Sequence, residues 1–254
     1  MLSRSVEFLG SMAKSVAEQE VVLITGVSRG MGRAMVDGFV RRGHIVLGCA
    51  RSPKSIDDLR EIFSGHDFQI VNIADDSQVG SWAACSLKKY GAPHYLINNA
   101  AYFDYKAPLW QMDSEEFARY VNTNIEGTVN VIRHFLPAMI ARGRGFVVNF
   151  TSQWGRAVEE QLAPYCATKW AVDAITFALA KELRSTGVAA IGLNPGRVKT
   201  TMLGKYLGNA ATSDNGNYPT PQEWATVAVP FILKLTLRDN GRIRNVSNDL
   251  SMGK

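Results

Sequence analysis

The sequence has few cysteines and histidines, which limits the chemistry that it can carry. Its 254 residues include three cysteines and four histidines. The cysteine number is odd, no CxxC pair occurs and the histidines form no metal-ligand spacing. These absences argue against a disulfide framework and against a zinc site. We expect no metal, and a reducing compartment, the cytoplasm, fits this cysteine usage.

Long hydrophobic runs are also absent, since no apolar run approaches the length of a membrane span. The net charge is +5 and the isoelectric point about 9.1, but lysines and arginines are scattered and form no basic run. A mildly basic protein with an anionic small ligand accounts for this charge. We expect neither a nucleic acid nor a membrane partner.

The first twenty residues are an extension whose role the sequence leaves open. Residues 1–5 resemble the start of a transit peptide, whereas Glu7, Glu18 and Glu20 argue against one. We expect residues 1–20 to be a poorly ordered tail, with organellar targeting as the alternative.

Strand and helix patterns alternate from residue 21 to residue 193. Apolar runs typical of buried parallel strands occur at 21–25, 45–49, 68–73, 94–98, 146–151 and 188–193. Helical patterns separate them at 31–42, 56–63, 77–90, 114–142 and 162–184. This alternation predicts an α/β fold over residues 21–254, a single doubly wound Rossmann-type domain. Its parallel sheet should have about seven strands, with helices on both faces.

The alternation breaks beyond Pro195. Residues 204–218 are rich in Gly, Asn, Ala and Ser, which favours a loop, and a capped helix restarts at Thr220. Long loops outside the carboxyl ends of parallel strands commonly bind ligands. We therefore expect residues 197–220 to form a substrate loop.

A glycine-rich turn, TGVSRGMG at 25–32, joins the first strand to the first helix. Gly26 permits a tight turn, while Gly30 and Gly32 let the backbone approach a pyrophosphate at the helix N-terminus. A turn without any ligand is the alternative. The candidate dinucleotide contacts in this turn are Thr25, Gly26, Ser28, Arg29, Gly30, Met31 and Gly32.

The second strand ends without the acid that usually holds the ribose hydroxyls of NAD. Arg51 stands there instead, and Arg29 lies inside the glycine-rich turn. Two guanidinium groups suit the 2′-phosphate of NADP. The sequence therefore predicts NADP(H) over NAD, unless Arg51 only caps a surface turn.

Tyr165 and Lys169 stand four residues apart within a helical pattern and so share one helix face. A cation beside a phenol lowers the pKa of the phenol, and Ser152 lies upstream on a different element. Such groups can move a proton onto or off an oxygen. A tyrosine–lysine pair on a solvated face is the alternative.

Taken in order, these motifs resemble those of the short-chain dehydrogenase/reductase family. The resemblance covers the chain from about Val21 onward, and the separation of Ser152 and Tyr165, 165 − 152 = 13, is the family's spacing. The other matching marks are TGVSRGMG at 25–32, NNAA at 98–101, Asn124 before Gly127, YCATK at 165–169 and NPGRVKT at 194–200.

The resemblance implies reduction of a carbonyl by a nicotinamide cofactor. Tyr165 would protonate the carbonyl oxygen, Ser152 would bond it, Lys169 would hold the nicotinamide ribose, and Asn124 would hold a water for proton resupply. Further expected cofactor contacts are Ser52, Asn72, Ile73, Asn99, Ala100, Tyr165, Lys169, Pro195, Gly196, Val198 and Thr200.

Two positions depart from the family pattern. The usual NNAG reads NNAA, with Ala101 in place of the last glycine, and the usual acid after the third strand is Asn72. Alanine is still small, and an asparagine still offers an amide oxygen to an adenine amine. We expect neither change to threaten catalysis.

A narrower resemblance is to plant-type NADPH-dependent pterin aldehyde reductases. It is carried by GCARS at 48–52, SQWGR at 152–156, APYCATKWA at 163–171, LNPG at 193–196 and DNG at 239–241. It implies reduction of a 6-formyl pterin in folate salvage. Trp154 would stack on the flat ring, Arg156 would bond its oxygen and ring nitrogen, and Tyr102 would line the pocket. Each of these three could instead serve packing or the surface.

Two other functions remain open. The first is reduction of 3-oxoacyl thioesters or other carbonyls on the same fold, and the second is a non-catalytic NADPH-binding sensor or scaffold. By analogy with the family, we also expect a homodimer or homotetramer that pairs through the helices at 114–142 and 162–184. The second of these helices is apolar around much of its circumference.

Overall fold

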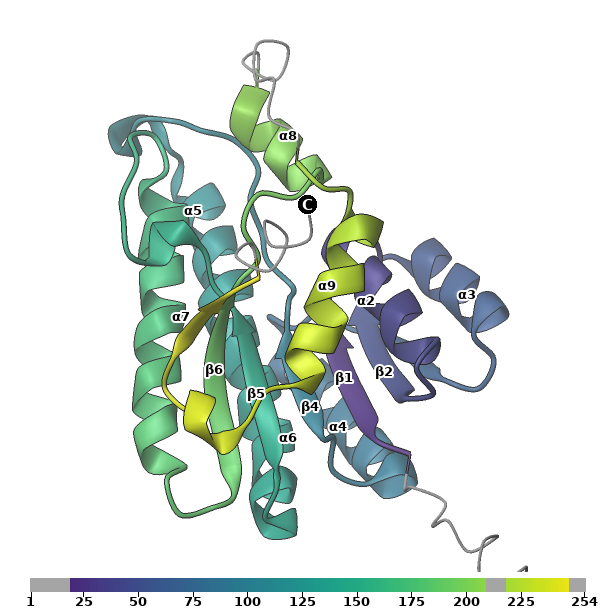
Figure 1. Cartoon of the computed structure of the whole chain (residues 1–254). Helices are drawn as coiled ribbons and strands as arrows, with labels where there is room; N and C mark the ends of the chain where they lie inside the picture. Colours follow the sequence, from purple (N-terminus) through teal and green to yellow (C-terminus); the bar gives the residue numbers. More distant parts are fainter. Residues whose placement is uncertain (1–18, 209–217, 247–254) are drawn as a thin grey trace, which may run out of the picture.

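The computed structural model describes residues 19–208 and 218–246. Within them, one sheet of seven strands has the order β3-β2-β1-β4-β5-β6-β7, and every neighbouring pair is parallel (Figure 1). The predicted parallel Rossmann-type sheet is confirmed. Residues 1–18 of the predicted N-terminal tail lie outside the described ranges. The strands are β1 Val21–Thr25, β2 Ile45–Ala50, β3 Asp67–Ile70, β4 Tyr95–Asn98, β5 Gly145–Phe150, β6 Val188–Asn194 and β7 Ile243–Asn245.

Helices cover both faces of the sheet. One face carries α2 Gly30–Val40, α3 Pro53–Ile62 and α9 Pro221–Leu233, and Figure 1 shows α2 and α9 side by side. The other carries α4 Asp76–Tyr90, α6 Gly127–Arg142 and α7 Ala163–Glu182. Two buried apolar clusters fill these layers, which explains why the strands have near-continuous apolar sequences.

The pattern predicted as one helix over 114–142 contains an irregular turn. Helix α5 (Ser114–Val121) continues through a π-helical turn, Asn122–Glu126, into α6. Such single-turn bulges insert into α-helices and occur often at functional sites. Here the turn holds Asn124, which is buried. The apolar periodicity extends across the bulge and therefore did not reveal it.

The region predicted as a substrate loop contains a short helix. Thr200 caps α8 (Thr201–Leu207) by accepting a hydrogen bond from the backbone N–H of Leu203. The predicted loop over 204–218 is thus helical at its start, because this cap outweighs the poor helix propensity of Gly204. Residues 209–217 lie outside the described ranges. The capped helix predicted to restart at Thr220 is α9, and Thr220 and Glu223 form a capping box at its start.

The strand order reverses next to β1, which pairs with β2 on one side and β4 on the other. In doubly wound sheets, ligands bind in the crevice outside the carboxyl ends of the strands at this point. The segments that follow β1, β4 and β5 therefore position the site. Across the described ranges, no helix combines the length and the apolar character that crossing a membrane requires.

Candidate active site

The glycine-rich turn after β1 is shaped by close backbone contacts. Gly26 has a φ of +75°, which favours glycine. A Cβ on Gly32 would lie 2.1 Å from the carbonyl oxygen of Gly26, so no side chain fits there. Asn99 braces the turn through its amide nitrogen, which donates to the carbonyl oxygens of Thr25 (2.9 Å) and Gly26 (3.2 Å). The turn is therefore rigid where it meets the N-terminus of α2.

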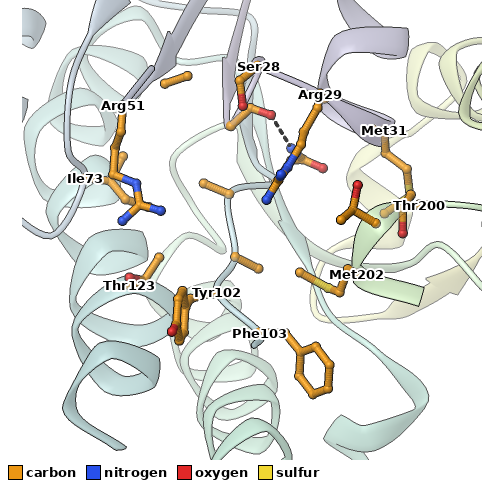
Figure 2. A pocket seen from close by; sticks show the side chains of 18 of the residues that line it. Ser28, Arg29, Met31, Arg51, Ile73, Tyr102, Phe103, Thr123, Thr200 and Met202 are labelled. Atoms are coloured by element: carbon orange, nitrogen blue, oxygen red, sulfur yellow. Dashed lines mark hydrogen bonds between the residues drawn. The ribbon is translucent and has the colours of Figure 1, made fainter. Parts of the chain in front are cut away.

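A cavity of about 390 Å³ lies against this turn (Figure 2). Figure 2 shows the side chains of Arg29 and Arg51 extending into it. Neither guanidinium has an ion pair to an acid among the described residues, which leaves both free to face an anion. We refer to this cavity as the cofactor groove. The predicted contacts that line it are Gly26, Ser28, Arg29, Gly30, Met31, Gly32, Arg51, Asn72, Ile73, Asn99, Ala100 and Thr200, with Tyr102 from the predicted substrate residues.

Two predicted cofactor contacts serve the protein itself. The hydroxyl of Thr25 is buried and accepts hydrogen bonds from the N–H groups of Asn99 (3.1 Å) and Ala100 (3.0 Å). Ser52 caps α3 by accepting from the N–H of Ser55 at 3.3 Å. Neither residue lines the groove, and the hydroxyl of each is held by hydrogen bonds from backbone N–H groups.

A second cavity of about 120 Å³ adjoins the groove, and we refer to it as the substrate pocket. Met31, Phe103, Thr200 and Met202 line both cavities. The pocket also contains Ser152, Trp154, Tyr165, Pro195, Gly196 and Val198, all predicted from the sequence. A group held in the groove and a group held in the pocket would therefore meet at the four shared side chains.

Ser152 and Tyr165 converge on one wall of the substrate pocket. Ser152 follows β5 and begins the 3-10 helix η3 (Gln153–Gly155), whereas Tyr165 lies in the first turn of α7. Burial raises the pKa of Tyr165 to about 12, and the neighbouring Ser152 hydroxyl opposes this rise. The phenol is therefore protonated at neutral pH, contrary to the depressed pKa that the sequence predicted.

Lys169 lies near Tyr165 but does not lower the pKa of the phenol as expected. Its Nζ lies 5.7 Å from the Tyr165 ring centroid and donates a 2.7 Å hydrogen bond to the carbonyl oxygen of Phe150. Burial lowers the pKa of Lys169 to about 8, and the negative charge of Asp173 opposes this shift. The loss of hydration by the phenolate thus exceeds any stabilisation from the lysine.

Asn124 in the π-helical turn acts as a structural clamp. Its Oδ1 accepts from the N–H of Tyr102 at 2.6 Å, and its Nδ2 donates to the carbonyl oxygen of Tyr102 and to the hydroxyl of Thr168, both at 3.1 Å. These bonds tie the segment after β4 to α7. Neither Asn124 nor Lys169 lines either cavity.

Aromatic side chains lie next to the Ser152–Tyr165 wall of the substrate pocket. Phe103 meets Tyr165 edge-on with ring centroids 5.4 Å apart, and Trp154 lies 6.3 Å from Tyr206 at a tilt of 42°. Tyr206 comes from α8 and donates to the carboxylate of Glu159 at 3.0 Å. The sequence prediction missed Met202, Leu203 and Tyr206 as pocket residues. The signal that could have revealed them is the helix cap at Thr200.

Arg156, predicted to contact substrate, has another partner. Its Nη1 donates to Asp173 Oδ2 at 3.0 Å, and it lines neither cavity. Tyr102 does line the groove, and its hydroxyl donates to the carboxylate of Glu116 at 2.9 Å. The same carboxylate also accepts a 3.4 Å hydrogen bond from Arg119 Nη1, so Glu116 holds both side chains.

Comparison with known proteins agrees with this architecture. Residues 20–210 match the family model described as short chain dehydrogenase. The chain belongs to the short-chain dehydrogenase family. It is thus an oxidoreductase, and the resemblance inferred from its motifs is confirmed.

Among similar proteins, the NADPH-dependent pterin aldehyde reductase of Arabidopsis thaliana is 38% identical over 243 residues, covering 94% of this chain and 98% of that protein. The gluconate 5-dehydrogenase of Burkholderia cenocepacia, solved with NADP and tartrate, superposes with a TM-score of 0.80 at 26% identity, covering 92% and 96%. The 3-ketoacyl-(acyl-carrier-protein) reductase of Brucella melitensis, complexed with NADH, gives 0.79 at 26%, covering 90% and 97%.

Proposed function

We propose that this short-chain dehydrogenase reduces a carbonyl group to an alcohol with NADPH, and that its substrate is the aldehyde of a 6-formyl pterin. One observation carries the reaction type: Ser152 and Tyr165 line the same pocket, and this pocket shares four side chains with the cofactor groove. The relative at 38% identity supports the substrate.

The protonated phenol suits reduction. A carbonyl oxygen in the pocket would accept a hydrogen bond from the Ser152 hydroxyl. It would take a proton from Tyr165 as negative charge develops on the oxygen. The nicotinamide cofactor supplies the hydride when bound. Because burial raises the pKa of Tyr165 to about 12, the proton is present at neutral pH.

Arg29 and Arg51 support NADPH over NADH. Both line the groove, and neither is neutralised by an acid in the described part of the chain. The remaining predicted contacts in the groove fit the rest of a dinucleotide, with a pyrophosphate at the N-terminus of α2. Arg29 and Arg51 would hold the 2′-phosphate of the cofactor by charge-assisted hydrogen bonds.

Trp154, Phe103 and Tyr206 support a flat substrate. Their rings border the substrate pocket, and two of them flank the Ser152–Tyr165 wall. Aromatic faces bind planar heterocycles by offset stacking. A 6-formyl pterin combines such a ring with an aldehyde, and its reduction would place the protein in folate salvage.

The test is a screen of carbonyl substrates with NADPH, led by 6-formylpterin and including an acetoacetyl thioester. We expect the highest kcat/KM for the pterin. A preference for the thioester would support the alternative function, a 3-oxoacyl reductase. Tight NADPH binding without turnover of any carbonyl would support a sensor or scaffold.

We also propose that the protein is a homodimer or homotetramer in a reducing, cytoplasmic setting. Large apolar side chains are exposed on the helices at 114–142 and 162–184: Phe117, Val129, Ile140, Trp170 and Phe177. Such a surface suits pairing between copies. A strict monomer at micromolar concentration in sedimentation would contradict the proposal.

A further inference from the structure

The turn that carries Ser152 is pressed onto the helix that carries Tyr165. A Cβ on Gly155, three residues beyond Ser152, would lie 2.7 Å from Asp173 Oδ2 and 3.0 Å from the carbonyl oxygen of Lys169. Only a glycine lets the turn come this close to α7. The two catalytic hydroxyls therefore depend on a contact made outside both cavities.

Two side chains of α7 form hydrogen bonds with the two residues that follow Gly155. Asp173 accepts a 3.0 Å hydrogen bond from Arg156, and the indole nitrogen of Trp170 donates to the carbonyl oxygen of Ala157 at 3.3 Å. The attachment is thus made at consecutive residues, directly after η3. None of these four residues lines either cavity, so none is placed to touch a substrate.

Asp173 is a buried acid whose charge must be balanced. Its side chain is 4% exposed, whereas that of Arg156 is 40% exposed. Burial raises the pKa of Asp173, and the Thr151 hydroxyl and the charges of Arg156 and Lys169 oppose this effect. A buried carboxylate is destabilising unless it is paired. Removal of Arg156 or of Asp173 should therefore disturb the turn that carries Ser152.

Asp173 also lies one helical turn beyond Lys169, on the same face of α7. The groups that face Lys169 are the Tyr165 ring, the carbonyl oxygen of Phe150 at the end of β5, and Asp173. Asp173 is the acid that acts on the buried ammonium. Its charge opposes the tendency of burial to neutralise Lys169.

We propose that Arg156 and Asp173 are positioning residues for proton transfer: the pair fixes the Ser152 turn against Tyr165, and its carboxylate keeps Lys169 in the ammonium form. Arg156 thus acts through the position of Ser152 and Tyr165 rather than by touching the substrate. The kinetic part of this proposal rests on the carbonyl reduction proposed above.

The kinetic test compares wild type with Asp173→Asn and Arg156→Met. We expect kcat to fall about tenfold in both, with KM nearly unchanged, since the pocket lining is intact. In Asp173→Asn the alkaline limb of the kcat–pH profile should move about one unit lower, because a negative charge near Lys169 is lost. Arg156→Met should not move it lower, and Arg156→Lys should restore kcat.

Arg60→Met is the matched control, because it breaks an exposed ion pair with Asp57 and the hydrogen bonds of Arg60 to Phe68 and Gln69, all at residues that line neither cavity. It should leave kcat and its pH profile unchanged. Arg156 is half exposed, so its variant is expected to fold even where Asp173→Asn does not. An unchanged kcat in folded Arg156→Met overturns the proposal.

A second measurement does not need turnover. The titration of Lys169 can be followed by NMR of carbon-13 lysine-labelled protein, with its signal assigned by its loss in Lys169→Arg. We expect a lower pKa in Asp173→Asn than in wild type, and an unchanged pKa overturns the proposal. If wild type reduces no carbonyl, the proposed function is wrong, while this titration still decides the role of Asp173.

Discussion

The ammonium of Lys169 donates a 2.7 Å hydrogen bond to the carbonyl oxygen of Phe150, two residues before Ser152. This bond joins α7 to the end of β5 beneath the Ser152–Tyr165 wall. It also explains how a lysine can be buried, since one of its three protons has a fixed acceptor. The charge of Lys169 is linked to the site by position, since its Nζ lies 5.7 Å from the Tyr165 ring centroid.

This linkage predicts how activity depends on pH. Burial lowers the pKa of Lys169 from 10.5 to about 8, so the ammonium is lost as the pH rises through about 8. Tyr165 does not titrate there, because its pKa is about 12. We expect kcat for carbonyl reduction to fall above about pH 8, measured with saturating NADPH and substrate.

Lys169→Arg is the control for this assignment, because arginine stays protonated throughout this range. Its residual activity should lack the limb near pH 8. A limb that persists unchanged in this variant would assign the titration to another group.

Cofactor choice should depend on the two arginines of the groove. Arg51→Asp places an acid where NAD-binding relatives of this fold hold the ribose hydroxyls. Charge-assisted hydrogen bonds contribute about 1.5–3 kcal/mol each, so the preference for NADPH over NADH should fall by about 100-fold or more. KM values for the two cofactors measure this.

Arg184→Asp makes the same charge change at an exposed residue in the turn after α7, which lines neither cavity. It should leave both KM values unaltered. If Arg51→Asp behaves like this control, the arginine does not contact the cofactor.

Much of this architecture follows from local sequence signals. The buried strands are short apolar runs, and glycines mark the turn after β1, so the parallel sheet and the groove could be predicted. The π-helical turn around Asn124 could not, because an inserted residue does not interrupt the apolar pattern. The seventh strand, β7, could not be located either, because three residues are too few to show a strand pattern.

The parts of the site that depend on tertiary contacts could not be predicted from the sequence. The spacing of Tyr165 and Lys169 placed both on α7, but it could not show that burial would raise the pKa of the phenol. Arg156 appeared as a substrate contact because nothing in the sequence pairs it with Asp173, seventeen residues later. Long-range ion pairs of this kind require the fold.

Substrate shape should depend on Trp154. Replacing it by leucine keeps an apolar side chain but removes the aromatic face next to Ser152. Base–aromatic stacking contributes about 1–3 kcal/mol, so KM for 6-formylpterin should rise about tenfold. KM for a small aliphatic aldehyde should change little, and the ratio of the two KM values is the measurement.

Tyr206→Phe provides the matched comparison, since it keeps a ring against Trp154 and loses only the hydrogen bonds to Glu159. It should retain the preference for the pterin. Equal losses for both aldehydes in Trp154→Leu would mean that the tryptophan only anchors its turn.

Proton donation by Tyr165 is the central claim, and Tyr165→Phe tests it most directly. This change removes the hydroxyl while keeping the ring that packs against Phe103. With NADPH and the best carbonyl substrate, kcat should fall about 10³-fold, within the range that general acid catalysis supplies, while the Kd for NADPH stays within about twofold. Undiminished NADPH oxidation in this variant would contradict the account.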